Sequence, residues 1–276
     1  MFGKLLKYDF LATGRIMGIV YAIFAAVSIY VIAPFYFNDI PAEEMGPMEA
    51  LKVGLLVLVV IALFIVTIVT IMIHFQKSLY SDQGYLTFTL PVKSFSILTS
   101  KVLVSSFWYL LASFSSLASI FIVIDALSKS LGEEGISLIE MLLSIFDENL
   151  NMGALVFMLV CMLVNGFASV FLYILEVCFA VTISNTRHFQ KHHVIFTLLF
   201  SAITVIVATT INSALADSIL LGVSLNESGE SLKFVTDIAD ANITCINILP
   251  AVTSIIFAVG FFFVTHYVMK KKINLQ

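Results

Sequence analysis

Long apolar runs alternate with shorter polar stretches along the whole chain. A helix that crosses the hydrocarbon core of a bilayer needs about 20 mainly apolar residues, and six of the runs reach this length. The pattern therefore predicts six transmembrane helices, at about residues 16–37, 53–75, 102–124, 154–184, 194–216 and 248–268.

Composition supports a membrane protein and excludes a soluble one. The 276 residues are 60% hydrophobic and only 12% charged, whereas a soluble domain carries about 25% charged residues. Mean hydropathy is +1.06. We therefore predict an all-α polytopic membrane protein, a helical bundle that forms a single transmembrane domain over residues 1–276. We expect no nucleic-acid partner, because no basic patch is interleaved with aromatic residues outside the spans.

The distribution of charge predicts the topology. Of the 14 Lys and Arg residues, 11 fall at the two termini and in the segments 76–101 and 185–193, and the positive-inside rule places these parts in the cytoplasm. Of the 18 acidic residues, 15 precede the second, fourth and sixth spans. The outer loops, which include residues 126–153 and 217–249, are therefore expected to be anionic. Within the first of them, residues 136–143 have helical periodicity and predict an interfacial or external helix.

Residues 1–15 predict a short amphipathic helix before the first span. Such a helix lies in the membrane interface with its cations toward lipid headgroups, and a frayed cytosolic tail is the alternative. Its apolar residues fall near one helical face and its charged residues turn away: Phe2, Leu5, Leu6 and Phe10 against Lys4, Lys7 and Asp9.

The sequence contains no motif for ATP hydrolysis. Its only Gly-Lys pair, Gly3-Lys4, has no upstream glycine, so no phosphate-cradling loop is present. We expect no enzyme activity and no cofactor in this chain. His188 and His192 have a spacing that could bind a metal, but a basic loop that contacts lipid or a partner is the preferred interpretation, and no metal site is predicted.

Glu176 is the only acidic residue deep inside an apolar run. A carboxylate there is costly, so it should face protein or water and have a partner. Asn165 and Ser169 share its helical face. Two interpretations stay open: a site in a transport pathway, or a structural hydrogen bond to a neighbouring helix.

Small and hydroxyl-bearing residues line one face of the third and fifth predicted spans. Small residues let helices approach closely, so helix packing is favoured over a substrate-lined surface. The two stripes are Ser105, Tyr109, Ala112, Ser116 and Ser119, and Thr197, Ser201, Thr204, Ala208 and Asn212.

Residues 76–101 are the one long polar-to-amphipathic stretch on the predicted cytoplasmic side between two spans. Gly84 breaks the helix that would continue from the second span, and Pro91 stops or redirects the chain. Exposed aromatic residues such as Tyr85 and Phe88 require a protein or lipid surface to cover them. The stretch therefore predicts a docking segment.

This segment resembles the loop between the second and third spans of type-2 ABC exporter permeases of Gram-positive bacteria. In those permeases a Gly-Tyr-Leu segment followed by a Thr-Leu-Pro turn recurs, as in Gly84-Tyr85-Leu86 and Thr89-Leu90-Pro91. Gln83 stands where an acidic residue is expected, directly after Asp82. Residues 1–10 also resemble the amphipathic elbow helix of such permeases.

The resemblance implies a permease subunit in a bacterial cell membrane, with both termini cytoplasmic. It implies a short coupling helix between spans 2 and 3 that docks on separate ABC ATPase subunits, which bind ATP and Mg²⁺. It also implies a second permease subunit, as a homodimer or heterodimer, and substrates such as antimicrobial or amphipathic peptides, lipids or drugs. The coupling residues it implies are Asp82, Gln83, Gly84, Tyr85, Leu86, Phe88, Leu90 and Pro91.

Two other functions are compatible with six spans. An ion-coupled secondary transporter normally needs several intramembrane acidic residues or broken helices at the bilayer midplane, and the single Glu176 counts against it. A non-transporting membrane scaffold or sensor subunit is the other.

Overall fold

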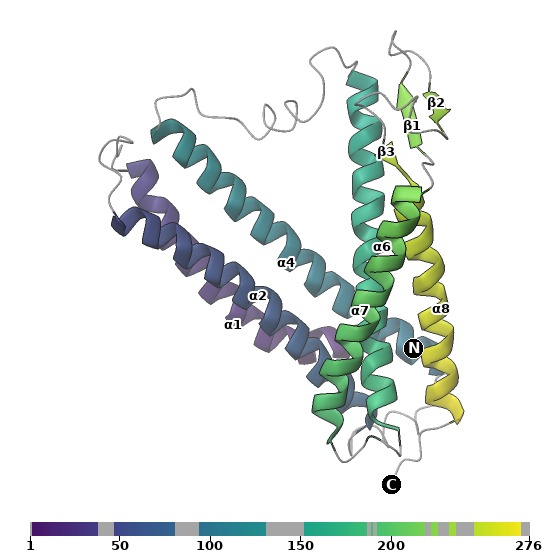
Figure 1. Cartoon of the computed structure of the whole chain (residues 1–276). Coiled ribbons are helices and arrows are strands. Elements are labelled where there is room, and N and C mark those ends of the chain that lie inside the picture. The colour runs from purple at the N-terminus through teal and green to yellow at the C-terminus, as the bar shows by residue number, and fades with distance from the viewer. Residues whose placement is uncertain are drawn as a thin grey trace. The chain divides into compact units, whose positions relative to one another are not determined.

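The computed structural model describes residues 2–37, 47–80, 94–130, 152–186, 189, 192–218, 222–225, 232–235 and 246–271. Six helices in this part of the chain are long and apolar enough to cross a membrane, so the predicted number of spans is confirmed. The chain is a multi-pass α-helical membrane protein. The helices are α1 (Phe2–Phe37), α2 (Pro47–Tyr80), α4 (Ser94–Ser130), α6 (Met152–Ser184), α7 (His193–Ser218) and α8 (Leu249–Lys271), as Figure 1 shows.

The helices on either side of the predicted docking segment are longer than the apolar runs. α2 continues to Tyr80, and α4 begins at Ser94 rather than near residue 102. Hydropathy marks only the part of a helix that matches the hydrocarbon core, whereas the backbone hydrogen bonds of a helix continue into flanking polar residues. The docking segment is therefore helical at both ends, and only its middle, residues 81–93, lies outside the described residues.

Residues 2–15 and the first span form one continuous helix, α1. Asp9, which the sequence places away from the apolar face of this stretch, is 8% exposed and therefore buried. Asp9, Thr13 and Met17 are all buried and follow one another at intervals of four residues, which places them on one helical face. The packing face of the span thus continues into this stretch. Its place at the membrane interface stays a prediction.

The contacts divide the chain into two compact units. The α6 unit comprises Met1–Leu6, Met72–Ser106 and Phe146–Gln276, and the α1 unit comprises Lys7–Ile71 and Phe107–Ile145. The helices α2 and α4 contribute residues to both. The single transmembrane domain expected from the sequence stays a prediction.

The core of the α1 unit lies where α1, α2 and the second half of α4 meet. Phe24, Leu63 and Ala112, one from each helix, form a buried cluster. Ala112 belongs to the predicted small-residue stripe of α4, and its neighbours Ser116 and Ser119 are also buried. The hydroxyl groups of these two serines donate to carbonyl oxygens of α4 itself. The small side chains of the stripe thus let the helices approach closely. The hydrogen bonds of Ser116 and Ser119 stay within α4.

Trp108 joins α1 to α4 within the α1 unit. Its Nε1–H donates to Thr13 Oγ1 at 2.9 Å, and its backbone carbonyl accepts from the Tyr21 hydroxyl at 2.8 Å. Its ring stacks on Phe10, with 5.0 Å between ring centroids, and on Tyr21. The indole is 7% exposed. It therefore combines hydrogen bonding with a large buried apolar surface.

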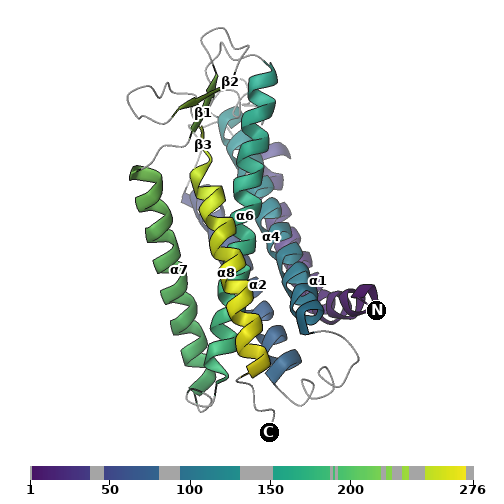
Figure 2. The same ribbon diagram turned by 90° about the vertical axis from the view of Figure 1, so that its right-hand side faces the viewer.

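The helices α7 and α8 pack against α6 in the α6 unit. Figures 1 and 2 show α6, α7 and α8 running side by side, and α6 contacts both of the others. On α7, Thr197 pairs with Ser184 of α6, and Asn212 bonds to Thr253 and Ser254 of α8. These residues of α7 belong to the polar stripe predicted in the fifth span, and they hold helices together as the packing interpretation requires.

A small antiparallel sheet lies within the predicted outer loop 217–249, where the sequence indicated only a long loop. The strands β1 (Gly222–Leu225), β2 (Leu232–Val235) and β3 (Ile246–Asn247) pair in the order β2-β1-β3. Val223 lies opposite both Phe234 and Ile246.

We expect Trp108→Ala to lower the free energy of unfolding by about 3–5 kcal/mol, because it removes a buried aromatic ring from the contact of α1 with α4. The measurement is thermal unfolding of the detergent-purified protein, followed by circular dichroism. Phe114→Ala is the matched control, since Phe114 lies on the same helix and is 51% exposed. Equal losses of stability in the two variants would contradict the role assigned to Trp108.

Candidate functional site

The residues that the sequence predicts to couple to an ATPase all lie outside the described residues. The structure does describe the helices that enter and leave this segment, α2 and α4, and the helix against which they pack, α6. The candidate site is therefore built from those flanking residues. The coupling residues outside the described part are Asp82, Gln83, Gly84, Tyr85, Leu86, Phe88, Leu90 and Pro91.

The end of α2 is anchored on α6. Tyr80, the last residue of α2, donates its hydroxyl to Thr182 Oγ1 of α6 at 2.8 Å. Thr182 is fully buried and in turn donates to the backbone carbonyl of Cys178 at 2.8 Å. Leu79, beside Tyr80 in the chain, is also fully buried. Side-chain bonds and apolar packing therefore fix the last turn of α2 to α6.

The beginning of α4 is anchored on the same end of α2. Lys101 of α4 is only 3% exposed, and its Nζ donates to Ser78 Oγ of α2. Burying an ammonium group costs free energy that hydrogen bonds must offset. Ile97 and Leu98, one turn earlier in α4, are buried as well. Both ends of the segment 81–93 thus leave from one packed junction of α2, α4 and α6, which we call the anchor: Ser78, Tyr80, Lys101 and Thr182.

Glu176 lies inside the packed half of α6. It is 2% exposed, and its Oε1 has no hydrogen-bond partner among the described residues. The hydrogen bond that a structural interpretation requires is thus not made by this oxygen in the described part of the chain. A role in a pathway stays a prediction too.

One helical face of α6 carries Asn165, Ser169 and Glu176, but these three residues do not form one site. Ser169 is exposed, and its hydroxyl donates to the backbone carbonyl of Asn165 at 2.9 Å. Glu176 is buried and lies about 10 Å farther along the helix axis. Helical spacing places residues on a face, but it does not say which part of that face is covered by other helices.

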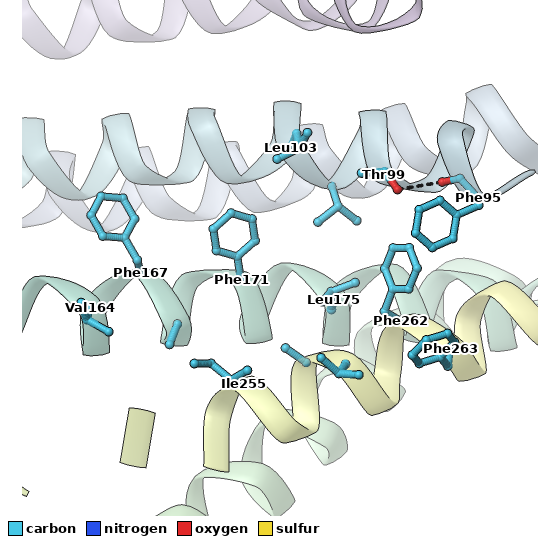
Figure 3. A pocket seen from close by; sticks show the side chains of 14 residues that line it. Phe95, Thr99, Leu103, Val164, Phe167, Phe171, Leu175, Ile255, Phe262 and Phe263 are labelled. Atoms are coloured by element: carbon cyan, nitrogen blue, oxygen red, sulfur yellow. Dashed lines mark hydrogen bonds between the residues drawn. The ribbon is translucent and has the colours of Figure 1, made fainter. Parts of the chain in front are cut away.

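An apolar groove of about 760 Å³ lies in the α6 unit, bounded by α4, α6 and α8. Figure 3 shows Phe167 and Phe171 pointing from α6 toward α4, with Leu175 one turn farther along. At one end of the groove the rings of Phe95 from α4 and Phe262 from α8 meet edge to face, with 5.1 Å between centroids.

The groove offers apolar contact and almost no polar chemistry. Among the residues that line it, Thr99 alone carries a polar side-chain atom, and this hydroxyl donates to the backbone carbonyl of Phe95 at 2.8 Å. Apart from this hydroxyl, the described residues of the wall include no acid, base or nucleophile. The groove can therefore hold an apolar group, but its lining has no means of reacting with one.

Sequence reasoning missed this groove, although part of the signal was present. Phe167, Phe171 and Leu175 recur at intervals of four residues and so share a face of α6. The same spacing is expected for an ordinary packing face. Only the positions of α4 and α8 show that this face borders an open groove.

A second groove, of about 920 Å³, lies in the α1 unit between α1 and α4. Small residues such as Ala25, Ser28 and Ala118 line much of it. The Oγ of Ser28 is buried without a hydrogen-bond partner among the described residues.

The described residues contain no group of three or more potential metal-ligating side chains. His192 is exposed, and His188 lies outside the described residues, so their predicted spacing is not tested. Cys161 and Cys178 are free thiols. Cys245 and the predicted helix at 136–143 also lie outside the described residues.

We expect the hydroxyl groups of Tyr80 and Thr182 to stabilise the protein together. Tyr80→Phe and Thr182→Val should each lower stability, and the double variant should lose less than the sum, with a coupling energy of about 0.6–1.7 kcal/mol. Thermal unfolding in detergent measures all four proteins of this cycle. Tyr30→Phe is the control, because Tyr30 is 63% exposed. Fully additive losses would show that the bond contributes nothing.

We expect Glu176→Leu to raise stability by about 1–3 kcal/mol, because it removes a buried polar group that lacks a partner for one oxygen. Glu176→Gln should leave stability close to that of the wild type. Both are measured by thermal unfolding in detergent. If Glu176→Leu lowers the stability more than Glu176→Gln does, the carboxyl group has a stabilising partner and the prediction is wrong.

Comparisons with protein-family models, curated proteins and solved structures found no match for this chain. A function is therefore inferred from the sequence together with the anchor and the groove.

Proposed function

We propose that this protein is the membrane-spanning permease subunit of an ATP-driven ABC exporter in a bacterial cell membrane. In this proposal the chain forms the substrate pathway and couples it to separate ATPase subunits. The observation that carries the proposal is the anchor, which bonds the end of α2 to α6 and the first turns of α4 to the same end of α2. The helix α6 also lines the apolar groove.

The anchor supports a mechanical route from the segment to the groove. A displacement of residues 81–93 pulls on Tyr80 and, through its bond to Thr182, on α6. The bond from Lys101 to Ser78 makes α4 follow the end of α2. Because α6 carries Phe171 and Leu175, its movement shifts a wall of the groove. The coupling residues Asp82 to Pro91 would receive the force from a docked ATPase as a short cytoplasmic coupling helix.

The energy source in this proposal is a partner. The sequence has no phosphate-cradling loop, so ATP and Mg²⁺ would bind on the ATPase subunits and not on this chain. A second permease subunit, identical or different, would complete the transporter. Both termini would be cytoplasmic, with residues 1–15 as an elbow helix at the interface.

The groove supports an amphipathic substrate. Its lining is apolar and its volume of about 760 Å³ falls in the range of sites for small molecules. An amphipathic peptide, a lipid or a drug each has an apolar part that such a wall can cover.

The burial of Glu176 favours a second candidate function, that of an ion-coupled secondary transporter. Acidic residues within membrane-spanning segments mark proton relays in pumps and transporters, and Glu176 is buried in such a segment. Only this one acidic residue is buried in α6, however, and it does not line the groove. Collapse of the proton gradient at constant ATP separates the two candidates: export by the proposed permease persists, whereas export by a secondary transporter stops.

We expect Tyr85→Asp and Phe88→Asp each to uncouple ATP hydrolysis from export, because a charge on the docking surface prevents burial of the aromatic ring against the ATPase. Membrane insertion and thermal stability should not change. The measurement is ATPase activity and substrate export in proteoliposomes. Tyr85→Phe, which keeps the ring, is the matched control and should retain coupling. Full export by both Asp variants would refute the coupling role.

Co-purification in mild detergent tests the proposed assembly. Wild-type protein should retain a phosphate-loop ATPase and a second permease subunit, and Phe88→Asp should lose the ATPase while keeping the permease. A protein that purifies without any ATPase, and exports nothing on addition of ATP, would favour a scaffold or sensor.

A further inference from the structure

We propose that the groove of the α6 unit binds one acyl chain of an anionic membrane lipid, with the lipid headgroup at the end of the groove near His266 and Lys270. This binding does not depend on ATP-driven transport, so it can be tested separately from the proposed function.

The length of the groove matches one leaflet of a bilayer. Its lining residues run from Val164 to Leu175 on α6 and from Ile255 to Phe263 on α8, which corresponds to about 12–16 Å along the helix axes. The hydrocarbon core is about 30 Å thick, so each leaflet contributes about 15 Å. The lining residues are centred on the middle of α8, so an acyl chain with its headgroup at Lys270 reaches the groove first at Phe263 and extends inward from there.

The groove is open in a direction that lipid can reach. Val164 is 50% exposed and Phe263 is 61% exposed, and both lie in membrane-spanning helices. Lipid chains surround such residues, so a chain can enter sideways without crossing a polar barrier. The lining hydroxyl, that of Thr99, is already bonded to Phe95. The groove therefore favours an apolar ligand, and each CH₂ group that the ligand buries there adds to the affinity.

The charge at one end of the groove identifies the headgroup. The ring of Phe95 lies edge to face with His266, 6.2 Å between centroids, at the end formed by Phe95 and Phe262. His266 Nδ1 is buried and has no hydrogen-bond partner among the described residues. Lys270 follows Phe262 and His266 at intervals of four residues, so these three share one face of α8. An imidazole and an exposed ammonium group beyond the apolar wall suit an anionic headgroup.

The size of the groove favours an acyl chain over another helix. A helix segment 15 Å long and 10 Å across occupies about 1,200 Å³, whereas the groove holds about 760 Å³. A helix from a second copy of the chain could therefore insert only its side chains, whereas a single acyl chain is thin enough to lie within the groove.

The test is photolabelling of the full-length protein in vesicles of phosphatidylglycerol and phosphatidylethanolamine. The phosphatidylglycerol carries a diazirine at the middle of one acyl chain, and mass spectrometry identifies the labelled peptides. We expect labels to concentrate on peptides with Phe167 to Leu175 and Ile255 to Phe263. Ala168 and Ala258 line the groove and are each 8% exposed. Ala168→Phe and Ala258→Phe should each reduce labelling of the opposite helix about tenfold, the effect of excluding roughly two methylene groups.

Ala202→Phe is the matched control, because Ala202 is exposed on α7 and does not line the groove. It should leave groove labelling unchanged. Moving the diazirine to phosphatidylcholine should lower groove labelling in the wild type, and K270Q should remove this preference for the anionic lipid.

Three results would overturn the proposal: equal labelling of the groove and of α7, groove labelling that survives both filled variants, or equal labelling by the two lipids. Cross-links between two copies of the Phe167→Cys variant, in place of lipid labelling, would assign the groove to a second copy. Intact groove labelling of a wild-type protein that purifies without any ATPase and exports nothing on addition of ATP would count against the proposed function alone.

Discussion

The hydrogen bond from Tyr80 to Thr182 ties the end of α2 to the most deeply packed part of the α6 unit. A hydroxyl group buried among apolar helices gains free energy by finding an acceptor within the protein, because the surrounding lipid offers none. The Tyr80 hydroxyl finds Thr182 Oγ1, and the Thr182 hydroxyl finds the backbone carbonyl of Cys178. The bond thus sets the position of the last turn of α2, after which residues 81–93 begin.

The two halves of α6 have different environments, and this difference links the anchor to the groove. From Leu172 to Ser184 nearly every side chain is buried, including small residues such as Ala180 that allow close packing. Toward its other end, residues such as Met162 and Val164 are about half exposed. The same helix is therefore buried at the end that belongs to the anchor and partly exposed at the end that lines the groove. Glu176 lies in the buried half, where packing alone does not explain an acidic side chain.

Apolar runs of about 20 residues were enough to predict the six spanning helices, because burial in lipid depends on composition. The polar stripe of α7 was also correctly predicted to take part in helix packing, since Asn212 bonds to α8. The burial of Asp9 was not predictable, because it depends on what α1 packs against. The sheet was missed because strands as short as Ile246–Asn247 are defined by their pairing. The groove likewise depends on three helices that are distant in sequence.

The anchor constrains how the groove can change shape. Ser78 and Tyr80 of α2 hold α4 and α6 at the same end, through Lys101 and Thr182. The groove walls are α4 on one side and α6 with α8 on the other. Walls that are tied together at one end separate most easily at the other. Any widening is therefore expected at the end lined by Val164 and Ile255, while the contact of Phe95 with Phe262 stays closed. The end beside the anchor, where Phe95 also contacts His266, would then keep its shape while the far end widens.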